Sequence, residues 1–308
     1  MKIAVLYGGT SGEREVSLSS GKGIMNALKQ KGHEVIGIDF HPNKLNEILE
    51  LNVDMVFIGL HGKFGEDGKI QSLLDMKEIP YVGSGVLASA LAMDKSKAKQ
   101  IFHQNGLPIA KGKTYHHADF SSTEAFVTDI LTNFSIPFVI KPNQEGSTLG
   151  LTIVKKEEQI EEAIKSAFTH DTELIVEEYV KGREMTVAVW GKRGEETAFP
   201  VIEIIPKNEY YDYESKYAEG GSEHIVPANI DADLSRELME FAVKAHQILG
   251  CKTYSRVDFI VDEGNNPIIL EVNTLPGMTP TSLFPDAARA KGISYEDMIE
   301  TFIQMSIE

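Results

Sequence analysis

Apolar residues recur along the N-terminal part of the chain with the periods of buried strands and an amphipathic helix. Short apolar runs at residues 2–8, 35–40 and 54–60 predict three strands, and the pattern from Ser17 to Gly32 predicts a helix after the first of them. A strand, a helix and a returning strand at this spacing predict a parallel sheet with right-handed crossovers. We therefore expect an α/β unit in this part of the chain.

The middle and C-terminal parts of the chain contain further predicted strands and helices. One helix is predicted over residues 86–105, and the polar segment 111–135 that follows it is a candidate boundary region. Strands are predicted at residues 136–141, 151–154, 174–180 and 185–190, and helices at 157–168, 233–249 and the C-terminal end. This mixture favours an α/β fold with α+β subdomains.

Two apolar runs near the C-terminus flank a cluster of turn residues, and this pattern predicts a β-hairpin. A turn centred on residues 264–265 places Asp258 opposite Glu271 and Arg256 opposite Asn273. Because side chains alternate along a strand, these four side chains are expected on one face. The apolar residues expected on or near the other face are Phe259, Val261, Ile268, Leu270 and Val272.

Carboxylates directly opposite each other repel, so a cation is expected between Asp258 and Glu271. The candidates are Arg256 and a bound metal ion. Two carboxylates and the amide oxygen of Asn273 are hard ligands, which suit Mg²⁺ or Mn²⁺. An ordinary surface hairpin with an acidic rim fits the local pattern equally well, and both interpretations stay open at this point.

Two polar residues directly follow predicted strands of the N-terminal sheet. The glycine-rich loop at residues 8–12 precedes a helix, but it lacks the G-x-G-x-x-G spacing and the Walker lysine. Ligands of open α/β sheets bind at the carboxyl ends of strands, so Glu13 and His61 are candidate site residues. Taken alone, each is more often structural, as a solvated glutamate at a helix entrance or a histidine in a turn.

A second glycine-containing loop, residues 142–150, follows Lys141 at the end of a predicted strand. Its backbone N–H groups, beside that lysine, are suited to phosphate oxygens, and a mobile surface loop is the alternative. Lys95, Lys97 and Lys99 lie in the helix predicted upstream, where such a cluster is typical of a solvent-exposed face.

Residues 206–226 interrupt the regular pattern, because tyrosines alternate with charged residues and two glycines follow. The segment is too polar for a core and too long for a tight turn. Such loops in compact domains are often lids or binding loops, so a lid is predicted here.

The overall composition narrows the classes of partner. The length of 308 residues predicts two or three domains. The net charge of −16 argues against nucleic acid or anionic membrane as a partner but leaves nucleotides open. The lone cysteine, Cys251, allows no disulfide within the chain, which suits the cytoplasm. The first residues lack the features of a signal peptide, and no apolar run approaches the roughly 20 residues of a membrane helix.

The order of these segments resembles the ATP-grasp superfamily and, within it, the D-alanine–D-alanine ligase family most closely. This resemblance covers essentially the whole chain. Five segments carry it: residues 8–17 (GGTSGEREVS), 60–68 (LHGKFGEDG), 211–217 (YDYESKY), 271–279 (EVNTLPGMT) and the pair Ser282 and Leu283. The resemblance implies three domains: an N-terminal Rossmann-like domain (1–90), a central ATP-grasp subdomain (91–183), and a C-terminal ATP-grasp subdomain with the lid and the metal site (184–308).

The resemblance also implies roles for individual residues. ATP is expected to bind to Lys95, Lys141, Gly146, Ser147, Glu177, Tyr179, Val180 and Glu184. Two Mg²⁺ or Mn²⁺ ions are expected on Asp258, Glu271 and Asn273. The residues with expected catalytic roles are Glu13, Ser147, Tyr217, Arg256 and Gly277, and those expected to bind the amino-acid substrates are Glu13, His61, Lys216, Arg256, Gly277, Ser282 and Leu283.

The implied reaction joins two D-alanines through a D-alanyl phosphate, with release of ADP and phosphate, in peptidoglycan precursor synthesis. The resemblance further implies a cytoplasmic homodimer. Another ATP-grasp carboxylate–amine ligase and a non-catalytic nucleotide sensor are the alternatives. Glu13, His61 and the Lys216–Tyr217 pair argue against the first, and the complete set of arginine and metal ligands argues against the second.

Overall fold

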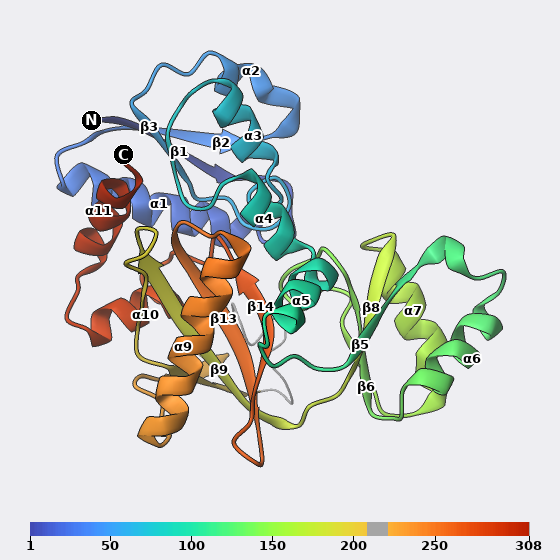
Figure 1. The fold of residues 1–308 in the computed structure, drawn as a ribbon. Coiled ribbons are helices and arrows are strands. Elements are labelled where there is room, and N and C mark those ends of the chain that lie inside the picture. The colour runs from blue at the N-terminus through green and yellow to red at the C-terminus, as the bar shows by residue number, and fades with distance from the viewer. Residues whose placement is uncertain (208–220, 308) are drawn as a thin grey trace.

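The computed structural model describes residues 1–207 and 221–307, whose strands form three sheets (Figure 1). The N-terminal sheet has the order β2-β1-β3-β4, and its neighbouring strands are parallel, as the sequence predicts. Its strands are β1 (Lys2–Gly8), β2 (Glu34–Phe40), β3 (Met55–Ile58) and β4 (Tyr81–Val82).

Helices cover the N-terminal sheet and connect it to the end of the chain. The helices of this region are α1 (Arg14–Gln30), α2 (Leu45–Leu49) and α3 (Lys69–Met76), with a short 3₁₀ turn, η1 (Pro42–Lys44). The C-terminal helix α11 (Tyr295–Ser306) lies beside α1, so the two ends of the chain meet (Figure 1). Phe57 and Phe302 share one hydrophobic core there, which fixes the C-terminal region against the N-terminal sheet.

The central sheet is antiparallel, with the order β5-β8-β6-β7. It comprises β5 (Gly112–His116), β6 (Phe138–Pro142), β7 (Thr152–Val154) and β8 (Glu173–Glu178), and it shares a core with α6 (Thr123–Asn133) and α7 (Ile160–Phe168). Two 3₁₀ turns, η2 (His117–Asp119) and η3 (Glu157–Gln159), lie in the connections. The sequence analysis did not predict β5 and α6, which occupy the polar segment 111–135.

The C-terminal sheet is also antiparallel, with the order β12-β11-β9-β13-β14, and β10 pairs with β9. Its strands are β9 (Gly182–Gly191), β10 (Thr197–Ala198), β11 (Ile202–Pro206), β12 (Ser222–Ile225), β13 (Thr253–Asp262) and β14 (Pro267–Asn273), and its helices are α9 (Ala232–Leu249) and α10 (Leu283–Ala290). The strand β12 falls within the segment predicted to be a loop. The domain boundaries given above stay predictions.

The single helix predicted over residues 86–105 is two helices, α4 (Val86–Met93) and α5 (Lys95–Gln104). The break lies at Asp94, which has an extended backbone with ψ of 94°, and the Asp94 carboxylate accepts a hydrogen bond from the Lys97 N–H at 3.0 Å. Asp94 therefore caps α5, a role that aspartate commonly takes and that the apolar period conceals.

The break at Asp94 also changes the expected exposure of the lysines. Lys95 and Lys99 are buried, one helical turn apart, whereas Lys97 is exposed. The prediction of a solvent-exposed lysine face is therefore wrong for Lys95 and Lys99. Within the described part of the chain, no helix has the length and apolar character needed to cross a bilayer.

Candidate active site

Two adjoining cavities bring together the predicted site residues that lie within the described ranges. The larger, of about 860 Å³, is lined by Glu13, His61, Arg256, Asn273, Gly277, Ser282 and Leu283. The smaller, of about 390 Å³, is lined by Lys141, Glu177, Tyr179, Val180, Glu184 and Asp258. Both are lined by Lys95, Gly146, Ser147 and Glu271. A group bound in one cavity therefore lies next to a group bound in the other.

The N-terminal side of the larger cavity is built around Glu13, which lies at the start of α1. The Ser147 hydroxyl donates a hydrogen bond to the Glu13 carboxylate at 2.5 Å. A side chain at Gly146 would bring its Cβ to 3.0 Å from the Glu13 Oε2 oxygen, so glycine lets the loop backbone approach this carboxylate. The interpretation of Glu13 as merely a solvated residue is thus wrong.

His61 is buried and links α1 to the loop that follows β14. Its Nδ1 lies 2.9 Å from the Leu275 carbonyl oxygen, and its Nε2 lies 3.0 Å from the Ser20 hydroxyl. Burial lowers the pKa of the imidazole, so His61 is neutral near pH 7. The histidine both organises two chain segments and lines the larger cavity.

Glu66 also lines the larger cavity, although the sequence analysis gave it no role. Its two carboxylate oxygens accept hydrogen bonds from the N–H groups of Gly62, at 2.8 Å, and Leu275, at 3.0 Å. Burial, reinforced by the nearby Glu13 carboxylate, raises the pKa of Glu66 to about 7. Glu66 lies within the motif at residues 60–68, which is the signal that could have drawn attention to it.

The predicted facing pairs of the hairpin are confirmed: Asp258 pairs with Glu271, and Arg256 pairs with Asn273. Directly after the Asp258–Glu271 pair the register shifts, so Phe259 pairs with Ile269 instead of Leu270. This β-bulge puts Leu270 beside Glu271 in the lining of the smaller cavity. The expectation that Leu270 lies on or near the opposite face is therefore wrong, because it assumed an unbroken alternation. It is wrong for Ile268 as well, which now pairs with Ile260, a residue of the same cavity lining.

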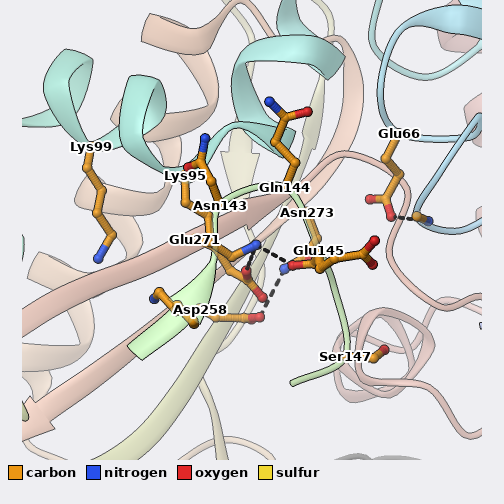
Figure 2. Close-up of polar contacts among 12 residues, drawn as sticks. Glu66, Lys95, Lys99, Asn143, Gln144, Glu145, Ser147, Asp258, Glu271 and Asn273 are labelled. Atoms are coloured by element: carbon orange, nitrogen blue, oxygen red, sulfur yellow. Dashed lines mark hydrogen bonds and ion pairs between the residues drawn. The ribbon is translucent and has the colours of Figure 1, made fainter. Parts of the chain in front are cut away.

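Each of the two facing carboxylates has its own cationic partner, and Figure 2 shows the Lys95–Glu271 pair. Arg256 donates to both oxygens of Asp258, at 2.9 and 2.8 Å, and the Lys95 ammonium lies 3.2 Å from Glu271. The Asn273 amide nitrogen donates to Asp258 at 2.9 Å. Figure 2 shows Lys95 reaching this group from α5, with Lys99 lying farther along the same helix.

The donor set of the hairpin fits a hard divalent ion. Asp258 and Glu271 supply carboxylate oxygens from adjacent strands, and Asn273 adds an amide oxygen, which matches the ligands that Mg²⁺ and Mn²⁺ prefer. Within residues 1–207 and 221–307, no cluster of three or more histidine, cysteine, aspartate or glutamate side chains forms a metal site. The candidate site thus has two carboxylates and one amide.

The smaller cavity has a buried charge cluster beside an apolar wall. The Lys141 ammonium lies 2.8 Å from one carboxylate oxygen of Glu177, and Lys99 forms an ion pair with the other. Burial disfavours the Glu177 carboxylate, but the two ammonium groups outweigh it and hold the Glu177 pKa well below its ordinary value. The apolar wall is formed by Val139, Ile153, Ile260 and Leu270, among others.

The loop before α10 closes the far side of the larger cavity. Ser282 precedes the first residue of α10, and its hydroxyl accepts a hydrogen bond from the Thr279 N–H at 3.1 Å. Gly277 packs closely on this serine, because a Cβ at Gly277 would lie 3.2 Å from the hydroxyl oxygen. Lys216 and Tyr217, and most of the predicted lid, lie outside the described residues, so their placement stays a prediction.

Two family models match the chain. The model described as D-ala D-ala ligase N-terminus matches residues 2–47 and 42–84, and the model described as D-ala D-ala ligase C-terminus matches residues 101–304. The chain belongs to the D-ala D-ala ligase family. The family expected from the sequence motifs is therefore confirmed.

Individual relatives agree over the full length. A D-alanine–D-alanine ligase of Halalkalibacterium halodurans is 58% identical over 309 residues, which cover 100% of both chains. The solved VanG D-Ala:D-Ser ligase of Enterococcus faecalis superposes with a TM-score of 0.86 at 33% identity, covering 99% of each chain. The ATP complex of the Bacillus anthracis D-alanine–D-alanine ligase has a TM-score of 0.84 at 30% identity, covering 100% of this chain and 97% of that one. The predicted ATP-grasp fold is confirmed.

Proposed function

We propose that this chain ligates two D-alanines to D-alanyl-D-alanine, with one ATP converted to ADP and phosphate. The observation that carries the proposal is the junction of the two cavities at Lys95 and Glu271. A triphosphate that extends from the smaller cavity brings its terminal phosphoryl group to this junction. An amino acid held at Glu13 in the larger cavity can then present its carboxylate to that group.

The smaller cavity suits the nucleotide. Its apolar wall offers van der Waals contact to a purine, and Glu177 and the backbone at Tyr179 and Val180 can bind the purine edge. Glu184 is placed to accept hydrogen bonds from ribose hydroxyls. Lys141 and Lys95 supply positive charge for the phosphates, with N–H groups of the loop at residues 146–150 as further donors.

Asp258, Glu271 and Asn273 would hold the metal ions. Bound there, two Mg²⁺ or Mn²⁺ ions would neutralise the phosphate oxygens during phosphoryl transfer. The protein itself orients these ligands. The Thr186 hydroxyl donates a hydrogen bond to Asp258 at 2.6 Å. The Lys95 ammonium pairs with Glu271 and also donates a hydrogen bond to the Glu145 carbonyl oxygen at 2.6 Å.

In the first step, Glu13 binds the ammonium group of the first D-alanine. A carboxylate oxygen of this substrate attacks the γ-phosphorus, the bond to the β,γ-bridging oxygen breaks, and ADP leaves with that electron pair. The product is D-alanyl phosphate, an acyl phosphate that water hydrolyses. Enclosure in the larger cavity, and closure of the predicted lid over it, would limit this loss.

In the second step, Ser282, the Leu283 N–H and Lys216 bind the carboxylate of the second D-alanine. Its amine loses a proton and attacks the acyl carbon, and the carbonyl oxygen gains negative charge. Arg256 and the Gly277 N–H stabilise this oxyanion. The tetrahedral intermediate then collapses to the peptide as phosphate leaves. The Ser147–Glu13 hydrogen bond, extended by Tyr217, is the candidate route for the proton of the amine.

A panel of acceptors tests this proposal. Purified protein with Mg²⁺ and ATP should release phosphate when D-alanine is added, and mass spectrometry should detect D-alanyl-D-alanine. D-Serine and D-lactate belong in the panel, because VanG D-Ala:D-Ser ligase is among the structural relatives. Phosphate release that needs no amino acid, or a clear preference for another pair of substrates, would contradict the proposal.

The cellular setting is part of the same proposal. We place the protein in the cytoplasm as a homodimer that supplies the dipeptide for peptidoglycan synthesis, on the support of the family assignment. Light scattering after size-exclusion chromatography should give about twice the 34.0 kDa mass of one chain. A mass of one chain at all concentrations would count against the dimer.

A further inference from the structure

Lys99 is a buried lysine to which the reaction above gives no role. It lies on α5 one helical turn after Lys95, and both side chains are buried, whereas Lys97 between them is exposed. Lys95 reaches Glu271, and Lys99 reaches Glu177. The lining of the two cavities, over the described residues, does not include Lys99. Lys99 therefore acts on a ligand only through Glu177.

The contact between Lys99 and Glu177 is built into the surrounding strands. Glu177 lies on β8, and its strand neighbour on β5 is Gly112. A Cβ at Gly112 would lie 3.0 Å from the Glu177 Cγ, so the glycine makes room for this side chain. Lys141, on β6, holds the second carboxylate oxygen at 2.8 Å. The cluster thus has two ammonium groups around one carboxylate and a net charge of +1.

Nucleotide binding changes the demands on this cluster. This step rests on the proposed function, in which Lys141 binds a phosphate of ATP. When Lys141 turns toward phosphate, Glu177 keeps only one cation, Lys99. A buried carboxylate without a cationic partner tends to take up a proton. Without Lys99, Glu177 would therefore either become protonated or keep Lys141 away from the phosphate.

We infer that Lys99 is a positioning residue for purine selection: it keeps Glu177 ionised, and so a hydrogen-bond acceptor for a 6-aminopurine, while Lys141 binds phosphate. Adenine presents a 6-amino donor to this carboxylate. A 6-oxopurine such as hypoxanthine presents an oxygen there, which the carboxylate repels. Burial and the neighbouring Lys141 lower the pKa of Lys99, but Glu177 opposes them, and Lys99 stays protonated at neutral pH.

Selectivity between ATP and inosine triphosphate (ITP) tests this role. Lys99→Met should raise both the KM and the Kd for ATP about tenfold or more, the scale of one charge-assisted hydrogen bond, with a smaller change in kcat. The ratio of ATP affinity to ITP affinity should fall by a similar factor, because a protonated Glu177 can donate to a 6-oxo group. Lys97→Met, on the same helix, is the matched control and should leave both quantities unchanged.

A double mutant keeps the test decisive even if Lys99→Met does not fold. Lys99→Met with Glu177→Gln removes one positive and one negative charge together, so the net charge of the cluster stays +1, carried by Lys141. If Lys99 acts through Glu177, this double mutant has the same ATP/ITP affinity ratio as Glu177→Gln alone. Two results would overturn the inference. One is an ATP/ITP affinity ratio that differs tenfold between these two variants. The other is a folded Lys99→Met variant whose ratio stays within twofold of that of the unmutated protein.

Calorimetric binding of ATP and ITP separates this inference from the proposed function. The Kd ratio is read without any acceptor substrate. An unmutated protein that binds ATP but makes no D-alanyl-D-alanine would contradict the proposed reaction, while the Kd ratios would still decide the role of Lys99.

Discussion

The Ser147 hydroxyl donates to the Glu13 carboxylate at 2.5 Å, across 134 positions of sequence. Ser147 has a φ of 52°, a left-handed backbone that serine seldom adopts, and Thr148 follows with a φ of 65°. The hydrogen bond therefore joins a strained loop of the nucleotide cavity to the entrance of α1. Ser147 lines both cavities, so this contact lies where the two cavities meet.

The first prediction concerns the proposed metal ligands of the hairpin. Glu271→Gln should lower kcat about a hundredfold or more at ordinary Mg²⁺ concentrations while the circular-dichroism spectrum stays native, because the amide is a weaker ligand. Glu263→Gln, at the exposed tip of the same hairpin, is the control and should retain activity. A folded Glu271→Gln variant with near-normal turnover would exclude Glu271 as a metal ligand.

Arg256 is expected to act in the transition state. Its guanidinium already holds Asp258 through two hydrogen bonds and lines the larger cavity, where the proposed reaction would develop its oxyanion. Arg256→Ala should lower kcat by roughly 10²–10³-fold, the scale for one oxyanion donor. Arg256→Lys keeps the charge but loses the fork, so an intermediate loss is expected. An effect confined to the KM for ATP would make Arg256 a ground-state binding residue instead.

Glu66 should make stability depend on pH in a defined direction. Its pKa is raised from an ordinary 4.5 to about 7, so between these values the folded protein keeps a proton that the unfolded chain has lost. The contribution of Glu66 to the free energy of unfolding is therefore full below about pH 4.5 and is lost as pH rises toward 7.

Denaturant unfolding at about pH 5 and about pH 8 measures this effect of Glu66. Relative to Glu66→Gln, which cannot ionise, the unmutated protein should be less stable at the higher pH than at the lower. If the free energies of unfolding of the unmutated protein and Glu66→Gln differ by the same amount at both pH values, Glu66 titrates normally. Adding D-alanine should lower the pKa of Glu66, because the substrate ammonium enters the cavity that Glu13 and Glu66 line.

Tyr217 bears on the choice of acceptor, although it lies outside the described residues. A histidine at this position, when protonated, would repel the ammonium of D-alanine. A neutral tyrosine imposes no such repulsion. Tyr217→His should therefore gain D-alanyl-D-lactate formation, more at low pH than at high pH, as product analysis can measure. Mainly depsipeptide from the unmutated protein at pH 7 would contradict this interpretation.

Local patterns in the sequence predict several parts of the site. The turn residues near position 264 define a register in which Asp258 faces Glu271, and that register is present. The bulge beside Leu270 lies beyond such prediction, because alternation assumes an unbroken ladder. The helix break at Asp94 is similar: its capping chemistry is visible in the sequence, but a continuous apolar period obscures it.

The long-range contacts of the site have no local signal. The local sequence predicts an exposed Lys99, because its ion-pair partner, Glu177, lies 78 positions away in the sequence. Glu66 likewise depends on Leu275, which the fold brings to it from the other end of the chain. Residue types and family motifs identify candidates for a site, but burial and charge pairing follow from the tertiary fold.

Transfer of oxygen from the substrate to phosphate tests the central claim most directly. D-Alanine labelled with ¹⁸O in its carboxylate, given to the protein with Mg²⁺ and unlabelled ATP, should pass one ¹⁸O atom to each phosphate released with the dipeptide. The label moves because the substrate carboxylate attacks the γ-phosphorus and leaves its oxygen there when the acyl phosphate is cleaved. Released phosphate without ¹⁸O, with its new oxygen derived from water, would contradict the acyl phosphate reaction.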